Sequence, residues 1–199
     1  MNPEIVIVRI LALPLILPSI ILHELAHGQM ARLLGDPTAE RQGRLSFNPL
    51  SHIDWVGLMM LIFFGIGWAK PVPINPYYFR DYKKGLALVG LAGPLANLTV
   101  AWFLAAFFFK VLAVRAGFLA EVIAIAVQLN LVLTVFNLIP VPPLDGSRIL
   151  MGLLPDGLMP FFLQLEQVGF FILLFLVFFM PGFQMLIFYA VDFLFRLMV

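Results

Sequence analysis

Long apolar runs separated by short polar stretches dominate this chain and predict a bundle of membrane helices. A mostly apolar run of about 20 residues is long enough to cross the hydrocarbon core of a bilayer as a helix. The runs lie at residues 5–34, 86–109, 118–138, 161–179 and 183–198. The pattern predicts an all-α polytopic membrane protein with about five transmembrane helices.

A further apolar stretch, at residues 55–68, is too short to cross the bilayer. At a rise of about 1.5 Å per residue, a helix of this length spans well under the membrane thickness. The stretch also contains three glycines, Gly57, Gly65 and Gly67. We therefore expect a re-entrant or interfacial hairpin rather than a sixth crossing.

Two segments beside this hairpin could be extended. Residues 44–47 alternate weakly between polar and apolar, which favours a short β element in the 39–50 region. Residues 70–76 carry three prolines, which push their preceding residues away from helical geometry. Gly43–Asn48 is the first candidate for a strand that pairs with an extended substrate, and Val72–Asn75 is the second; a plain connecting loop fits equally well.

Composition agrees with a membrane protein. Of the 199 residues, 62% are hydrophobic and 12% are charged, against about 25% charged in typical soluble domains. We expect a single membrane-embedded domain over 1–199, with a core at 5–154 and a C-terminal helical pair at 161–198. The basic residues form no stripe, so the lipid bilayer is an expected partner and nucleic acid is not.

The basic residues also predict an orientation in the membrane. Seven lie in or at the edge of the connection between the first two spans, and two lie in the next connection. Because cytoplasmic loops are enriched in Lys and Arg, the first connection is expected in the cytoplasm. A short chain of this kind suits a prokaryotic cytoplasmic membrane.

The sequence His-Glu-Leu-Ala-His at residues 23–27 carries the most specific chemical signal. Residues four apart share one helix face, so His23 and His27 can bind one zinc ion while Glu24 serves as a general base. The chain has no cysteine and one further histidine, His52, so a zinc site needs histidine and carboxylate ligands.

A carboxylate is the expected third ligand. Asp145 is the best candidate, because it begins a short helix expected to reach Leu154 and lies at the same membrane depth as the histidines. Glu166 and Asp192 remain alternatives, since carboxylates within apolar helices are costly and are usually functional.

Four motifs in order resemble the site-2 protease family of intramembrane zinc metalloproteases. They are His-Glu-x-x-His at 23–27, Gly-Pro-Leu-Ala-Asn at 93–97, Asn-Leu-Ile-Pro at 137–140 and Leu-Asp-Gly at 144–146. The resemblance covers the core of the chain and leaves no room for a PDZ or CBS domain, so it indicates a minimal member.

This resemblance implies residue roles and an activity. It implies one zinc per chain, held by His23, His27 and Asp145, with Glu24 as the catalytic base. The implied reaction is hydrolysis of peptide bonds in or near transmembrane segments of a membrane protein or peptide substrate. The alternative is a zinc-binding transporter or sensor without hydrolytic activity.

Three further polar residues are candidates for contacts with the substrate or the oxyanion. Asn97 could position substrate or could simply form a hydrogen bond between packed helices. Asn137 could bind the oxyanion or could satisfy carbonyls freed by Pro140. His52 is hypothesised to approach the zinc or its water in some state.

Overall fold

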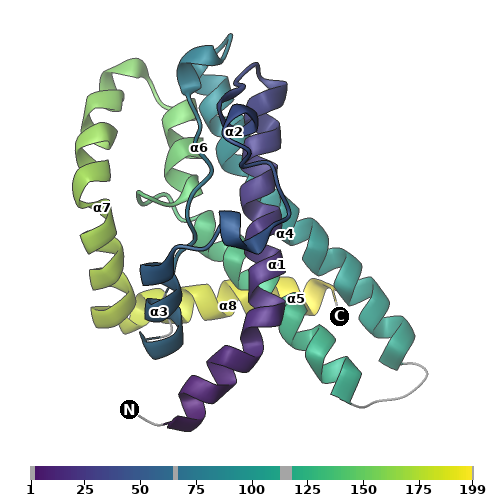
Figure 1. Ribbon diagram of the computed structural model, residues 1–199. Helices are drawn as coiled ribbons and strands as arrows, with labels where there is room; N and C mark the ends of the chain where they lie inside the picture. The colour runs from purple at the N-terminus through teal and green to yellow at the C-terminus, as the bar shows by residue number, and fades with distance from the viewer. Residues whose placement is uncertain (1–2, 65–66, 113–117, 199) are drawn as a thin grey trace.

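The computed structural model describes residues 3–64, 67–112 and 118–198, and these residues are almost entirely helical (Figure 1). The α-helices are α1 (Pro3–Leu33), α2 (Thr38–Arg41), α3 (Trp55–Phe64), α4 (Tyr82–Leu112), α5 (Phe118–Asn137), α6 (Asp145–Leu153), α7 (Met159–Phe179) and α8 (Pro181–Met198). Single 3-10 turns lie at Pro49–Ser51, Pro76–Tyr78 and Asp156–Leu158.

Five of these helices are long and apolar enough to cross a membrane: α1, α4, α5, α7 and α8. Their bounds agree closely with the apolar runs of the sequence, so the prediction of an all-α polytopic membrane protein is confirmed. In Figure 1, α1, α4 and α5 lie together in the centre, α7 stands on one side, and α8 runs across the view.

Small residues bring α6 close to the first half of α4. A Cβ atom on Gly90 would lie 3.0 Å from the Asp145 carbonyl oxygen, and one on Gly152 would lie 2.5 Å from the Lys83 carbonyl oxygen. Such close contact between helices is typical of small residues in membrane bundles. It places the start of α6, and with it Asp145, against α4.

The predicted hairpin is present. After α3 the chain turns back, and a Cβ atom on Gly57 would lie 2.1 Å from the carbonyl oxygen of Trp68. An antiparallel bridge between Ile53 and Ala69 closes its base. The Arg9 guanidinium of α1 donates to the carbonyl oxygens of Ile62 and Phe63 at the end of α3. The tip at residues 65–66 lies outside the described residues.

The prediction of a short β element in the 39–50 region is wrong. Helix α2 occupies Thr38–Arg41, and Gly43 then adopts a positive φ of 64°, which interrupts an extended course. The Arg44 side chain donates to the carbonyl oxygens of Lys70 and Pro71, groups that a neighbouring strand would otherwise use. Within the described residues, the Ile53–Ala69 bridge is the sole β pairing.

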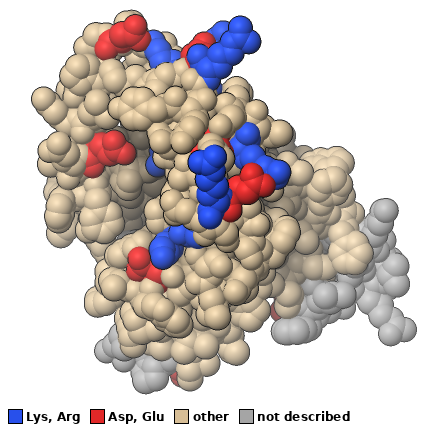
Figure 2. Space-filling model, turned by 45° about the horizontal axis from the view of Figure 1, so that its top comes forward, with Lys and Arg blue, Asp and Glu red and all other residues tan. Residues whose placement is uncertain are grey.

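Charged side chains concentrate at one end of the molecule. In Figure 2 most of the visible Lys, Arg, Asp and Glu side chains lie over the end that carries α2, and broad uncharged surface covers the remainder of the view. Exposed ion pairs at this end include Arg32 with Glu40 and Lys84 with Asp81.

Candidate metal centre

Three buried side chains meet where α1, α4 and α6 pack together. The Nε2 atoms of His23 and His27 lie 3.0 Å apart. The Asp145 Oδ2 atom lies 3.0 Å from the first and 3.1 Å from the second. Exposure of the three residues is only 4–7%. The structure therefore brings the two histidines of α1 together with an aspartate 118 residues further along the chain.

The hydrogen bonds of the outer ring nitrogens determine where the imidazole protons lie. The Nδ1 atom of His27 donates to the Val89 carbonyl oxygen at 2.7 Å, because a carbonyl can only accept. The Nδ1 atom of His23 faces the Asn97 Oδ1 at 2.6 Å, and this oxygen likewise accepts. Each neutral imidazole therefore has an unprotonated Nε2 that points toward Asp145.

The Asp145 carboxyl faces both imidazoles from a buried position. Burial opposes ionisation, but hydrogen bonds and positive charge from His23 and His27, when these rings are protonated on Nε2, hold the pKa of the carboxyl below its usual range. A cation between the ligand atoms would act in the same direction. Asp145 is the first residue of α6, where the Ser147 hydroxyl donates to the Leu144 carbonyl oxygen and closes the first turn. The carboxylate adds one negative charge to the two imidazole lone pairs.

This donor set fits a zinc ion. Two nitrogen lone pairs and one carboxylate oxygen repel one another at 3.0–3.1 Å unless a cation lies between them. Tetrahedral zinc with bonds of about 2.0–2.1 Å separates its ligands by about 3.3 Å, close to these distances. The donors also match the histidine and carboxylate ligands that zinc accepts.

Gly93 of α4 leaves the space beside these atoms open. A Cβ atom at Gly93 would lie 2.4 Å from the Nε2 atom of His27 and 2.6 Å from that of His23. No side chain can occupy this position without displacing the rings.

Replacing Gly93 by alanine should therefore reduce bound zinc to well below one per chain, with helix content unchanged. The matched control is Gly182→Ala in α8, where the new Cβ would have no atom within 4 Å. Metal analysis and circular dichroism of both variants test this expectation. A zinc content equal to that of the control would contradict the position assigned to Gly93.

A buried polar network supports His23 from behind. The Asn97 side-chain nitrogen donates to the Ser19 carbonyl oxygen and to Asn130 Oδ1, and the Asn130 nitrogen donates to the Ser19 hydroxyl. The network links α1, α4 and α5. Ser19 and Asn130 were not among the residues predicted from the sequence, although isolated polar side chains in apolar spans are a recognisable signal. Ser19 also precedes His23 by one helical turn.

The two asparagines that were candidates for contacts with the substrate or the oxyanion have hydrogen-bond partners within the protein. Asn97 is fully buried, and both ends of its amide are bonded within the protein, so it orients His23. The Asn137 nitrogen donates to the Leu133 carbonyl oxygen one turn earlier in α5. Neither asparagine directs a hydrogen-bond donor at the three ligand atoms.

Glu24 follows His23 on α1, and its Oε2 accepts a hydrogen bond from the Val72 amide at 2.9 Å. Val72 belongs to an extended segment that is bonded at several points along its length. The Lys70 amide donates to the His52 carbonyl oxygen, and the Asn75 amide donates to Asp36. The segment therefore crosses α1 at the motif and orients the Glu24 side chain.

His52 does not join the two motif histidines. Its ring is almost fully buried, and Nε2 donates to the Ser46 carbonyl oxygen at 2.7 Å. Among the described residues, His23, His27 and Asp145 form the sole group of three side chains able to share a metal. The alternative ligand Asp192 is paired with Arg196 on α8.

Several known proteins are similar to this chain in sequence. The model of peptidase family M50 matches residues 110–180, a segment that contains Asp145. A Bacillus subtilis protein named putative zinc metalloprotease YwhC is 41% identical over 163 residues, covering 78% of this chain and 74% of that protein. A Methanocaldococcus jannaschii protein, also named a putative zinc metalloprotease, is 31% identical over 148 residues, covering 73% and 71%. No solved structure matches the chain.

The apolar helices and these relatives define a metalloprotease that crosses the membrane several times. The chain belongs to peptidase family M50, the site-2 protease family, and the resemblance seen in the motifs is confirmed.

Proposed function

We propose that the chain is an intramembrane zinc metalloprotease that hydrolyses peptide bonds in or near transmembrane segments of membrane proteins. One observation carries this proposal: two imidazole lone pairs and a carboxylate converge between membrane helices, with a glutamate next to the first imidazole. The relatives named as zinc metalloproteases support the choice of metal.

In this proposal His23, His27 and Asp145 hold one zinc per chain. When bound, zinc polarises the scissile carbonyl and makes the attacking water more acidic. Glu24 accepts a proton from that water as its oxygen bonds to the carbonyl carbon. When the carbon–nitrogen bond breaks, Glu24 passes the proton to the departing amine. The Val72 amide orients the Glu24 carboxylate for both transfers.

The site is proposed to face the cytoplasmic side of a prokaryotic membrane. His27 lies toward the C-terminal end of α1, and this end leads into the connection that carries most of the basic residues. The gathering of charged side chains at that end in Figure 2 supports this orientation. The relatives from a bacterium and an archaeon support a prokaryotic source.

Removal and return of the metal tests the proposal. Purified protein in detergent should contain about one zinc per chain and cleave a transmembrane peptide. Cleavage should disappear after treatment with 1,10-phenanthroline and return with added zinc but not with magnesium, which prefers oxygen ligands. Cleavage that persists in metal-free protein would contradict the proposal. Bound zinc without cleavage of any transmembrane peptide would favour a transporter or sensor.

A further inference from the structure

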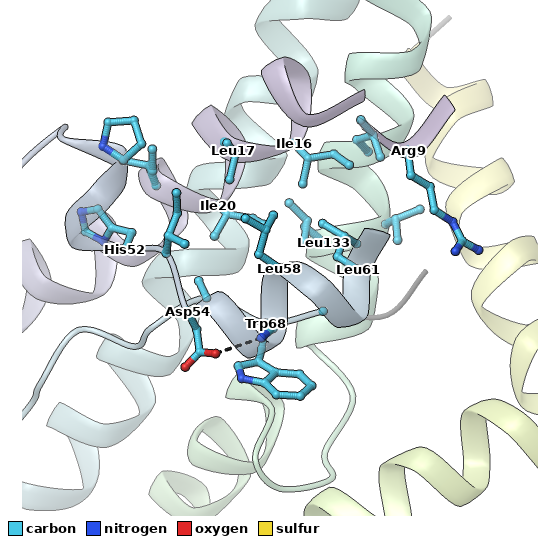
Figure 3. Close-up of a pocket in the computed structure, with 18 of the residues that line it drawn as sticks. Arg9, Ile16, Leu17, Ile20, His52, Asp54, Leu58, Leu61, Trp68 and Leu133 are labelled. Carbon is cyan, nitrogen blue, oxygen red and sulfur yellow. Dashed lines mark hydrogen bonds between the residues drawn. The ribbon is translucent and has the colours of Figure 1, made fainter. Parts of the chain in front are cut away.

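A pocket of about 380 Å³ lies between α1, the α3 hairpin and α5. Figure 3 shows Leu17 and Ile20 of α1 on one side and Leu58 and Leu61 of α3 on the other. Leu133 of α5 completes this part of the wall. The volume lies within the usual range of ligand pockets, about 300–1,000 Å³.

Two polar residues at the ends of the pocket, Arg9 and Asp54, are bonded within the protein, and His52 also lines the pocket, with an Nδ1 atom that has no partner among the described residues. At one end Arg9 donates to the Ile62 and Phe63 carbonyl oxygens. At the other end Asp54 accepts from the Gly57 amide, the bond drawn in Figure 3. The wall between these ends is aliphatic and aromatic, so burying a charged group there would be costly. An apolar occupant fits this lining.

Two segments that line the pocket continue along the chain to Glu24 or to its hydrogen-bond partner Val72. On α1, Ile20 and Ile21 line the pocket, and Glu24 follows them by four and three residues on the same helix face, about 6 Å further along from Ile20. On the extended segment, Ala69 lines the pocket, and Val72 three residues later donates to Glu24. The pocket therefore ends about one helical turn from the catalytic base of the proposed reaction.

We propose that this pocket binds large aliphatic side chains of the substrate. These side chains belong to substrate residues next to the scissile bond, on the part of the substrate that extends along α1 from Glu24 toward Arg9. The inference rests on the proposed proteolytic function and specifies its substrate class. Substrates are transmembrane segments with residues such as leucine at these positions. Alanine fills the pocket poorly, and a lysine there would be buried without a partner.

A substitution that fills the pocket tests the preference. Leu17→Trp is compared with Leu11→Trp, a change on the same helix at a residue that is 71% exposed. The substrates are two transmembrane peptides that differ only in leucine or alanine beside the cleavage site. Wild type and Leu11→Trp should favour leucine by about tenfold or more in kcat/KM, and Leu17→Trp should lose that preference. Zinc content confirms that each variant is folded.

Disulfide cross-linking tests occupancy without any cleavage. The chain has no cysteine, so Leu58→Cys in a Glu24→Gln background gives a single reactive thiol at the pocket. A substrate peptide with one cysteine beside the cleavage site should cross-link to it under mild oxidation. Phe171→Cys, at a residue of α7 that is 70% exposed, is the control and should cross-link at least about tenfold less.

Each outcome supports or overturns the proposal. Equal cleavage of the two peptides by wild type, an unchanged preference in Leu17→Trp, or no excess cross-linking at Leu58 would overturn it. A bound lipid seen by native mass spectrometry, removed by Leu17→Trp with the preference unchanged, would assign the pocket to an acyl chain instead. If wild type cleaves no peptide, the proteolytic function fails, and cross-linking still reports whether the pocket binds the segment.

Discussion

Replacing Asp145 by asparagine should remove both the bound zinc and the cleavage of a transmembrane peptide. The change keeps the size of the side chain but removes the negative charge that lies 3.0–3.1 Å from the two imidazole nitrogens. Two neutral imidazoles then remain to hold a doubly charged ion. Loss of a residue that only supports a metal ligand typically lowers metal affinity by about 10–100-fold. Loss of a ligand itself should lower zinc affinity by more than this.

Asp192→Asn is the matched control for this experiment, because Asp192 is also a carboxylate in an apolar helix and was an alternative third ligand. It pairs with Arg196 on the surface of α8, so its variant should retain zinc and activity. Metal analysis of purified protein at defined free zinc compares the two. Zinc retained by Asp145→Asn and lost by Asp192→Asn would reverse the assignment of the third ligand.

Replacing Glu24 by glutamine should separate metal binding from catalysis. The glutamine oxygen can still accept the hydrogen bond from the Val72 amide, so the extended segment should stay in place. The amide cannot accept a proton from water, and loss of a general base typically lowers the rate by about 10²–10⁴-fold. We expect one zinc per chain together with a cleavage rate lowered by this factor.

The same substitution at Glu166, an exposed carboxylate of α7, gives the control. Glu166→Gln should cleave the peptide at the wild-type rate. Rates are measured under single-turnover conditions, so that product release does not conceal the chemical step. Wild-type turnover by Glu24→Gln would show that another group carries the proton.

The features predicted correctly from the sequence depend on local spacing. A span is defined by a run of apolar residues, and the shared face of His23 and His27 follows from four residues of helix. The position of Asp145 beside the two histidines could be inferred, because Asp145 begins a later helix at the same membrane depth as the histidines. These arguments need no knowledge of which helices touch.

Features that depend on contacts between distant segments could not be predicted. Asn130 supports Asn97 across 33 residues, and Val72 bonds to Glu24 across 48 residues. The sequence does not indicate which group a loop histidine such as His52 will contact. In the structure, its partner is the Ser46 carbonyl oxygen. The expected β element failed because a four-residue alternation is too weak to exclude a short helix and an irregular loop.

The central claim is that His23, His27 and Asp145 hold one zinc ion between α1 and α6. An anomalous difference map from crystals of the wild-type protein, collected above and below the zinc absorption edge, tests it most directly. We predict a single peak about 2.0–2.2 Å from both Nε2 atoms and from a carboxylate oxygen of Asp145. A map with no peak there, or with a peak on other side chains, would contradict the account.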